Sequence, residues 1–284
     1  MKPPPFAYEA PATLEEALTL LDERAGDAVV LAGGQSLVPS LNFRLGAPEL
    51  LVDIGRLPGL AGVEAREGDL RVGALTTHSA LISAPTAREH LDALSQAARH
   101  IGHTAIRNRG TAGGSLAHAD PAAELSAVVA AADGRIELTS RTGTRQVGHD
   151  EFVLGPYLTT RRPGELVTAL LLPLNPTMRW GVAEVTRRSG DFALAGAVVG
   201  ISVEDGSVRD ARIALFGVEP VPRRLHDAEA ALVGTDGSSG GAAAPDSVEL
   251  ELDDPVAEGY RRHLAGVVVD QALERALARV EGAS

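Results

Sequence analysis

The chain has 284 residues, of which 26 are basic and 38 acidic, giving a formal net charge of −12 at pH 7. A surface of that sign repels phosphate backbones, so we expect no nucleic-acid partner. The absence of cysteine excludes disulfides, thiolate zinc sites and iron–sulfur clusters held by this chain. Lys2 is the only lysine, which excludes catalysis by an internal lysine. With neither a signal-peptide core nor an apolar run that could span a membrane, we expect a cytoplasmic protein.

The first predicted unit covers residues 1–57. A capping box that begins at Thr13 predicts a helix, because hydroxyl and carboxylate side chains satisfy the free N–H groups of a first turn. Strands are predicted at 28–31 and 50–54. Between them lies a glycine turn at 32–36, Ala-Gly-Gly-Gln-Ser, which leads into a predicted helical turn.

The second predicted unit covers residues 58–176. The apolar patterns predict strands at 70–73, 135–138 and 165–172, and helices at 90–101 and 121–132. Asp120 is the predicted N-cap of the second helix, with Pro121 at its first position. A second glycine turn, at 107–115, precedes that helix and reads Arg-Asn-Arg-Gly-Thr-Ala-Gly-Gly-Ser.

The third predicted unit covers residues 177–284. It has a predicted strand at 211–216 and, at 234–245, a segment rich in glycine, serine and alanine that is typical of a flexible surface loop. Asp254 and Pro255 are predicted to open the last helix. The mixture of helices and strands indicates an α+β or α/β chain.

The two glycine turns are the candidate binding elements. Each pairs two glycines with a hydroxyl residue, and glycine lets backbone N–H groups approach a ligand closely. Two such anion nests could hold a pyrophosphate without lysine or metal. The alternative is a pair of ordinary tight turns. Neither turn has the spacing of the Rossmann or P-loop motifs, which disfavours the usual nicotinamide and ATP sites.

Four segments together resemble the FAD-binding medium subunit of molybdenum hydroxylases, the family of aerobic carbon monoxide dehydrogenase and xanthine dehydrogenase. They follow one another over nearly the whole chain: 31–39 with 51–54, then 106–121, 186–193 and 260–265. The resemblance implies a two-lobed α+β FAD-binding domain of the vanillyl-alcohol-oxidase (PCMH) type, followed by a smaller C-terminal α+β domain.

The resemblance also implies the cofactor contacts, and it implies no catalytic or metal-ligating residue in this chain. The first loop would cradle the FAD pyrophosphate through Ala32, Gly33, Gly34, Gln35, Ser36 and Leu37. The second would surround pyrophosphate and ribityl oxygens through Thr111, Gly113, Gly114 and Ser115. The remaining implied contacts are Ile101, Asp120, Glu124, Val167 and Asp191. Core packing explains Ile101 and Val167 equally well, and Glu124 is equally consistent with an exposed first-turn residue.

One departure from the family pattern concerns charge. Some relatives carry a lysine near the flavin where this chain has Ala183 and Glu184, which puts the flavin potential in question. Arg187 and Arg188 either compensate or form a solvated strand edge. His100 and His103 have the spacing of metal ligands, but no third ligand is evident nearby, so we expect no metal there.

The resemblance implies that this chain performs only the flavin step of a larger enzyme. A large subunit would hold the molybdopterin cofactor and a small subunit two [2Fe–2S] clusters, in a dimer of heterotrimers. Electrons would pass from the clusters to FAD and then to an external acceptor, a quinone, NAD or another carrier. Two alternatives remain: a stand-alone flavin-dependent oxidoreductase, or a scaffold subunit that has lost FAD.

Overall fold

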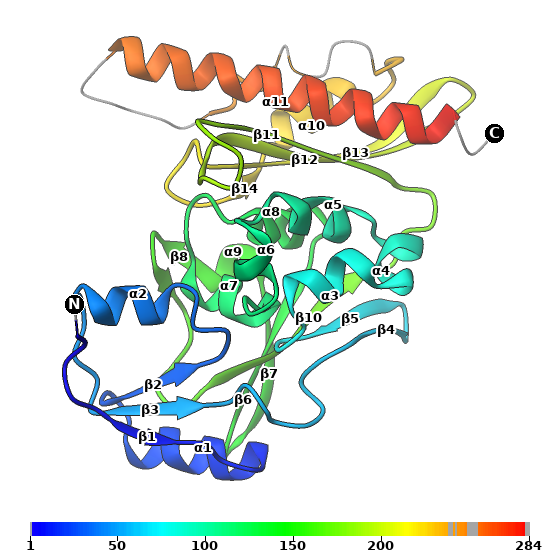
Figure 1. Cartoon of the computed structure of the whole chain (residues 1–284). Coiled ribbons are helices and arrows are strands. Elements are labelled where there is room, and N and C mark those ends of the chain that lie inside the picture. Colours follow the sequence, from blue (N-terminus) through cyan, green and yellow to red (C-terminus); the bar gives the residue numbers. More distant parts are fainter. Residues whose placement is uncertain (1, 238–240, 242, 249–254, 282–284) are drawn as a thin grey trace.

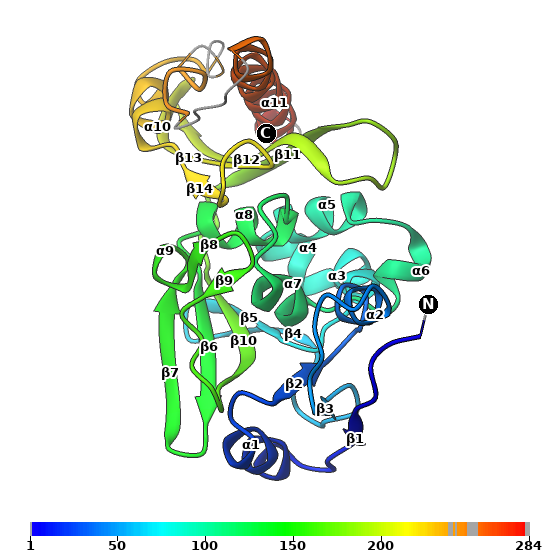
Figure 2. The same ribbon diagram turned by 90° about the vertical axis from the view of Figure 1, so that its left-hand side faces the viewer.

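The structure, a computed structural model, describes residues 2–237, 241, 243–248 and 255–281. The described residues form three main sheets in succession, each covered by helices, and one two-stranded hairpin sheet (Figures 1 and 2). The third sheet lies between the long last helix on one side and helices of the second unit on the other (Figure 1). The α+β class and the presence of a separate C-terminal sheet are thereby confirmed.

The first lobe is built on a small parallel sheet. Its elements are β1 (Ala7–Glu9), α1 (Leu14–Glu23), β2 (Ala28–Leu31), α2 (Leu37–Asn42) and β3 (Leu50–Asp53). The strand order is β1-β3-β2, with both outer strands parallel to β3. The capping box at Thr13 is confirmed, since its hydroxyl accepts from the Glu16 amide at 3.1 Å.

The second lobe has a five-stranded antiparallel sheet covered by short helices. The strands are β4 (Val63–Arg66), β5 (Asp69–Gly73), β6 (Arg135–Ser140), β7 (Gly143–Gly148) and β10 (Leu166–Pro173), in the order β4-β5-β10-β6-β7. The hairpin strands β8 (Val153–Gly155) and β9 (Leu158–Thr159) lie beside it. The helices are α3 (His78–Ser83), α4 (Pro85–His90), α5 (Ala93–His100), α6 (Thr104–Arg107), α7 (Ala112–His118), α8 (Glu124–Ala131) and α9 (His149–Phe152).

Two predicted helices of this lobe start too early. The helix predicted from residue 90 begins at Ala93, because Leu91 leaves the helical conformation and is buried in the core. The helix predicted from Pro121 begins at Glu124, with Ala123 in place of Asp120 as N-cap. Pro121 is drawn out of the helix because its carbonyl accepts from the Gly217 amide at 2.8 Å.

The C-terminal domain is a four-stranded antiparallel sheet under a long helix. Its elements are β11 (Arg179–Thr186), β12 (Ala193–Glu204), β13 (Ser207–Phe216), β14 (Arg223–Arg224), α10 (His226–Leu232) and α11 (Pro255–Glu281). Helix α11 packs directly on β11 and β12. The approach requires glycine at 181, where an added Cβ would lie 1.9 Å from the Ala272 carbonyl oxygen.

The prediction of a flexible surface loop at 234–245 is wrong in part: Gly234 and Asp236 are exposed, but other described residues of the segment are packed. Ala244 is fully buried in the C-terminal core, and the Gly241 amide donates to Asp270 at 2.7 Å. Small residues serve this segment because it passes close to α11. Residues 238–240 and 242, like Asp254, the predicted start of the last helix, lie outside the described residues.

One hydrophobic cluster joins the second lobe to the C-terminal domain. Trp180, Val198 and Phe216 of the third sheet share it with Leu125 of α8 and Leu170 of β10. A second cluster fills the space between the third sheet and α11, and a third cluster joins the first lobe to Leu60, Leu75 and Leu166 of the second. No helix in the described ranges is long and apolar enough to cross a membrane.

Candidate functional site

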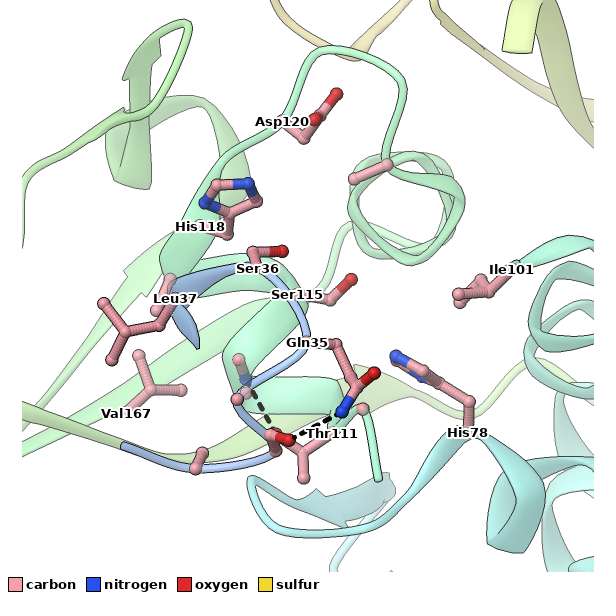
Figure 3. Close-up of a pocket in the computed structure, with 18 of the residues that line it drawn as sticks. Gln35, Ser36, Leu37, His78, Ile101, Thr111, Ser115, His118, Asp120 and Val167 are labelled. Atoms are coloured by element: carbon pink, nitrogen blue, oxygen red, sulfur yellow. Dashed lines mark hydrogen bonds between the residues drawn. The ribbon is translucent and has the colours of Figure 1, made fainter. Parts of the chain in front are cut away.

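A cavity of about 470 Å³ lies where the two glycine loops meet (Figure 3). Its wall contains every residue predicted for the cofactor site. From the first lobe these are Ala32, Gly33, Gly34, Gln35, Ser36 and Leu37, and from the remainder Ile101, Thr111, Gly113, Gly114, Ser115, Asp120, Glu124, Val167 and Asp191. The fold thus brings together segments that are up to about 160 residues apart in the sequence.

The first loop presents free backbone donors to this cavity. Within the described part of the chain, the N–H groups of Gly33, Gly34, Gln35 and Ser36 have no hydrogen-bond acceptor. Gly34 has φ +75°, a left-handed conformation that keeps the loop turning before α2. The side-chain amide of Gln35 donates from Nε2 to the Gly33 carbonyl oxygen at 3.1 Å and stabilises the loop. Consecutive free N–H groups beside a cavity are the arrangement that an anion nest requires, and anion binding by this loop stays a prediction.

The second loop differs from the prediction, because its backbone donors are already used. At the start of α7, the amides of Ala112 and Gly113 donate to the carbonyls of Thr76 and Ala74, at 2.9 and 2.8 Å. Those of Gly114 and Ser115 donate to the hydroxyl and carbonyl oxygens of Thr111. The cavity therefore has one backbone nest, and the second loop offers a smooth wall and the Ser115 hydroxyl (Figure 3).

The glycines of the two loops allow close approach, between the lobes at Gly33 and within the second lobe at Gly113. A Cβ on Gly33 would lie 2.2 Å from the Arg109 carbonyl oxygen. A Cβ on Gly113 would lie 2.5 Å from the Cβ atom of Ala74, on the segment after β5. Any larger residue would push one backbone away from the other, so these contacts fix the width of the cavity.

His78 is a cavity residue that the sequence did not reveal. It opens α3, its side chain is buried, and Figure 3 shows it pointing toward Gln35. Its Nδ1 atom has no hydrogen-bond partner. Burial, reinforced by the positive charge of Arg107, lowers its pKa to about 4, so the imidazole is neutral at pH 7. Thr77 and His78 follow a strand without any sequence motif of a binding site, so only the fold shows that His78 lines this cavity.

Glu124 lies half-buried in the cavity wall at the start of α8. The exposed alternative is therefore wrong. Burial raises its pKa to about 8, and the nearby carboxylates Glu184 and Asp120 act in the same direction. At neutral pH the group is a protonated acid, which can donate a hydrogen bond as well as accept one.

Apolar side chains line the cavity beside these polar groups. Val167 is buried in the core and Ile101 is half-buried against it, and both line the cavity, so core packing is confirmed while contact with the cofactor stays a prediction. At the rim, His118 packs against the Tyr157 ring with centroids 5.0 Å apart. The Tyr157 hydroxyl donates to Asp120 at 3.2 Å, and the Asp120 carboxylate also accepts from the Ala122 amide at 2.9 Å.

Ala183 and Glu184, which stand where some relatives have a lysine, lie on opposite faces of β11. Ala183 is fully buried in the cluster under α11, whereas Glu184 points the other way and pairs with His100, with 3.1 Å between Oε1 and Nδ1. Arg187 and Arg188 are exposed in the turn after β11 and lie outside the cavity wall. No group of three or more side chains that could hold a metal occurs in the described ranges.

The comparisons with known proteins agree with this arrangement. Residues 4–175 match the family described as the FAD-binding domain in molybdopterin dehydrogenase, and residues 180–276 match the CO dehydrogenase flavoprotein C-terminal domain. The chain belongs to this family of FAD-binding medium subunits of molybdenum hydroxylases, which are oxidoreductases.

Individual relatives are similar to the chain over nearly its whole length. The chain is 40% identical to the 6-hydroxypseudooxynicotine dehydrogenase complex subunit alpha of Paenarthrobacter nicotinovorans, over 98% of this chain and 97% of that one. It is 33% identical to the carbon monoxide dehydrogenase medium chain of Hydrogenophaga pseudoflava, over 98% and 99%. Among solved structures, reconstituted CO dehydrogenase from Oligotropha carboxidovorans superposes with a TM-score of 0.93 at 33% identity, covering 98% of this chain and all of that one (100%).

The cavity suits FAD on its own chemistry. The nest of the first loop supplies donors of the kind that a pyrophosphate requires. Ile101 and Val167 give an apolar wall of the kind that a flavin ring requires. The unpartnered Nδ1 of His78 leaves a polar atom in this wall without a contact from the protein. These features agree with the family assignment.

Proposed function

We propose that this chain is the electron-transfer subunit of a three-subunit molybdenum hydroxylase. It would receive electrons from two [2Fe–2S] clusters of a small subunit and pass them through FAD to an external acceptor. A large molybdopterin subunit would oxidise the substrate, in a cytoplasmic dimer of heterotrimers. The observation that carries the proposal is the cavity between two glycine loops in a chain with no cysteine, and therefore no cluster of its own.

The side chains of the cavity have distinct roles in this proposal. Gly33 to Ser36 would bind the pyrophosphate through their free N–H groups. Glu124, protonated at neutral pH, would bind a hydroxyl group without adding negative charge beside the phosphates. Asp191, at the rim, would position the turn next to the ring. When bound, FAD supplies the redox chemistry, since it can accept electrons singly and release them in pairs.

Three exposed aromatic side chains support the proposed assembly. Phe192 belongs to the cavity wall, yet its side chain is 75% exposed. Phe43 after α2 and Tyr157 in the β8–β9 hairpin are 64% and 61% exposed. Aromatic residues are enriched in protein interfaces, where one face stays wet until the partner binds. We assign these three residues to contact with the small subunit.

Co-expression with a small and a large subunit of this family tests the proposal. We expect a complex that contains iron, molybdenum and FAD, in which substrate bleaches the flavin absorbance under anaerobic conditions. Omitting the small subunit is expected to abolish this bleaching, although dithionite still reduces the flavin. Bleaching by substrate in this chain alone would instead establish a stand-alone oxidoreductase, and a chain that takes up no FAD would establish a scaffold.

A further inference from the structure

Glu184 is a buried carboxylate with an unsatisfied oxygen. Its side chain, on β11, is 7% exposed, and its Oε1 pairs with Nδ1 of His100 at 3.1 Å. Its Oε2 is buried and has no hydrogen-bond partner. A carboxylate oxygen without a donor is costly to bury, and burial favours the protonated form of the group. Glu184 is therefore a candidate for proton uptake.

His100 connects this carboxylate to water. Its side chain, at the end of α5, is 31% exposed and lines a second cavity of about 470 Å³. The walls of that cavity come from the end of α5, from α6, and from β11 with the turn that follows it. An imidazole can accept a proton at one ring nitrogen and release one from the other. His100 can therefore carry a proton from the second cavity to Oε1 of Glu184.

Glu184 also lies close enough to the cofactor cavity for its charge to act there. Gly102 and Gly190 line both cavities. Negative charge on Glu184 contributes to the raised pKa of Glu124, in the wall of the cofactor cavity. Charge interactions are reciprocal, so a new negative charge in the cofactor cavity would favour protonation of Glu184.

The other charged side chains around Glu184 have both signs. The second cavity adds the side chains of Arg99, His103 and Arg107, and the cofactor cavity those of Asp120, Glu124 and Asp191. On the opposite face of β11, α11 presents Arg275, which donates to the Val182 carbonyl. Positive charges oppose protonation of Glu184 and the carboxylates favour it, so the balance depends on any charge added in the cofactor cavity.

We propose that Glu184 is the proton acceptor coupled to reduction of the cofactor in the adjoining cavity, and that His100 supplies its proton. As two electrons enter the cofactor cavity, one proton moves from Nδ1 of His100 to Oε1 of Glu184, and Nε2 of His100 takes one from water in the second cavity. Reoxidation returns the proton by the same route. The inference rests on the proposed function, because that function supplies the cofactor and the electrons.

The slope of the flavin midpoint potential against pH tests the inference, because it reports how many protons are bound for each electron. The full chain is loaded with FAD and reduced with dithionite, so no partner subunit is needed. Glu184→Gln keeps the shape of the side chain but takes up no proton, so it should lower the slope by up to about one proton for each two electrons. His100→Gln should slow the reduction about tenfold. His103→Gln changes a histidine of the same cavity that does not pair with Glu184, and it should change neither quantity.

Two outcomes overturn the inference: an unchanged slope in Glu184→Gln, or equal reduction rates in His100→Gln and wild type. A chain that takes up no FAD contradicts the proposed function instead. In that case the pKa of Glu124, read by NMR of its carboxyl carbon in the FAD-free chain, still decides whether Glu184 acts on the cofactor cavity. Glu184→Gln should lower that pKa, because it removes a negative charge, and an unchanged value overturns the coupling.

Discussion

Glu124→Gln gives the sharpest test of the cavity electrostatics. A carboxyl whose pKa is raised in the folded state holds its proton there after the unfolded chain has lost it. Its contribution to stability is therefore lost as pH rises from the ordinary pKa of 4.5 to the folded pKa of about 8, and it is constant above that. Glutamine keeps the shape of the protonated acid and cannot ionise, so the variant should lose this dependence.

The size of the effect follows from the same values. Between pH 4.5 and pH 7, 1.36 kcal/mol per pH unit gives an upper limit of about 3 kcal/mol. Glu124 is half-buried beside a cavity that admits water, so screening reduces the expected loss to ~1–2 kcal/mol.

Urea unfolding of the FAD-free chain across a pH series measures this directly. Relative to wild type, Glu124→Gln should be more stable at pH 7 by ~1–2 kcal/mol and equally stable below about pH 4. Glu151→Gln, which changes an exposed carboxylate on α9, is the control and should follow the wild-type pH dependence. An identical pH slope in wild type and Glu124→Gln would refute the assignment of a raised pKa to this group.

Three further predictions concern the cavity and its bound cofactor. Gly34→Val should weaken FAD binding at least ~tenfold, because valine at φ +75° costs about 1–2 kcal/mol in strain and reorients the free N–H groups. Gly46→Ala, at an open position, should leave the flavin absorbance unchanged, and full flavin content in both variants would contradict the nest. His78→Phe should shift the flavin midpoint potential while FAD is retained, since it removes a neutral imidazole from the wall, and His78→Gln should restore part of the shift. An unchanged potential in the phenylalanine variant would show that His78 only packs. Asp191→Ala should alter the rate of flavin reduction more than FAD occupancy, as read by stopped-flow absorbance, and the reverse result would make Asp191 a binding residue.

The sequence predicted the parts of the site that depend on local chemistry. Gly34 is recognisable because its turn needs a residue that tolerates positive φ, and Thr13 is recognisable because a capping box is complete within four residues. Both features depend on neighbouring residues in the chain, and the structure has the turn at Gly34 and the capping box at Thr13.

The features that the sequence missed depend on partners far along the chain. The donors at the start of α7 look free in the sequence, but carbonyls of Ala74 and Thr76 occupy two of them. Asp120 has the features of an N-cap, but the Pro121 carbonyl accepts a hydrogen bond from the Gly217 amide, and the helix begins only at Glu124. The pairing of Glu184 with His100 joins residues 84 positions apart, so no local pattern could show it.

The hydrophobic cluster shared by the second lobe and the C-terminal domain restricts how the cavity can open. A hinge between the two would expose Trp180, Val198 and Phe216, all nearly or fully buried, at about 25 cal/mol for each Å² of apolar surface. The turn at 187–192 is mostly exposed and leaves the sheet as a free hairpin end. Opening by rotation of the domains is therefore costly, and we expect any opening of the cavity to involve this turn, where Gly190 and Asp191 line the wall.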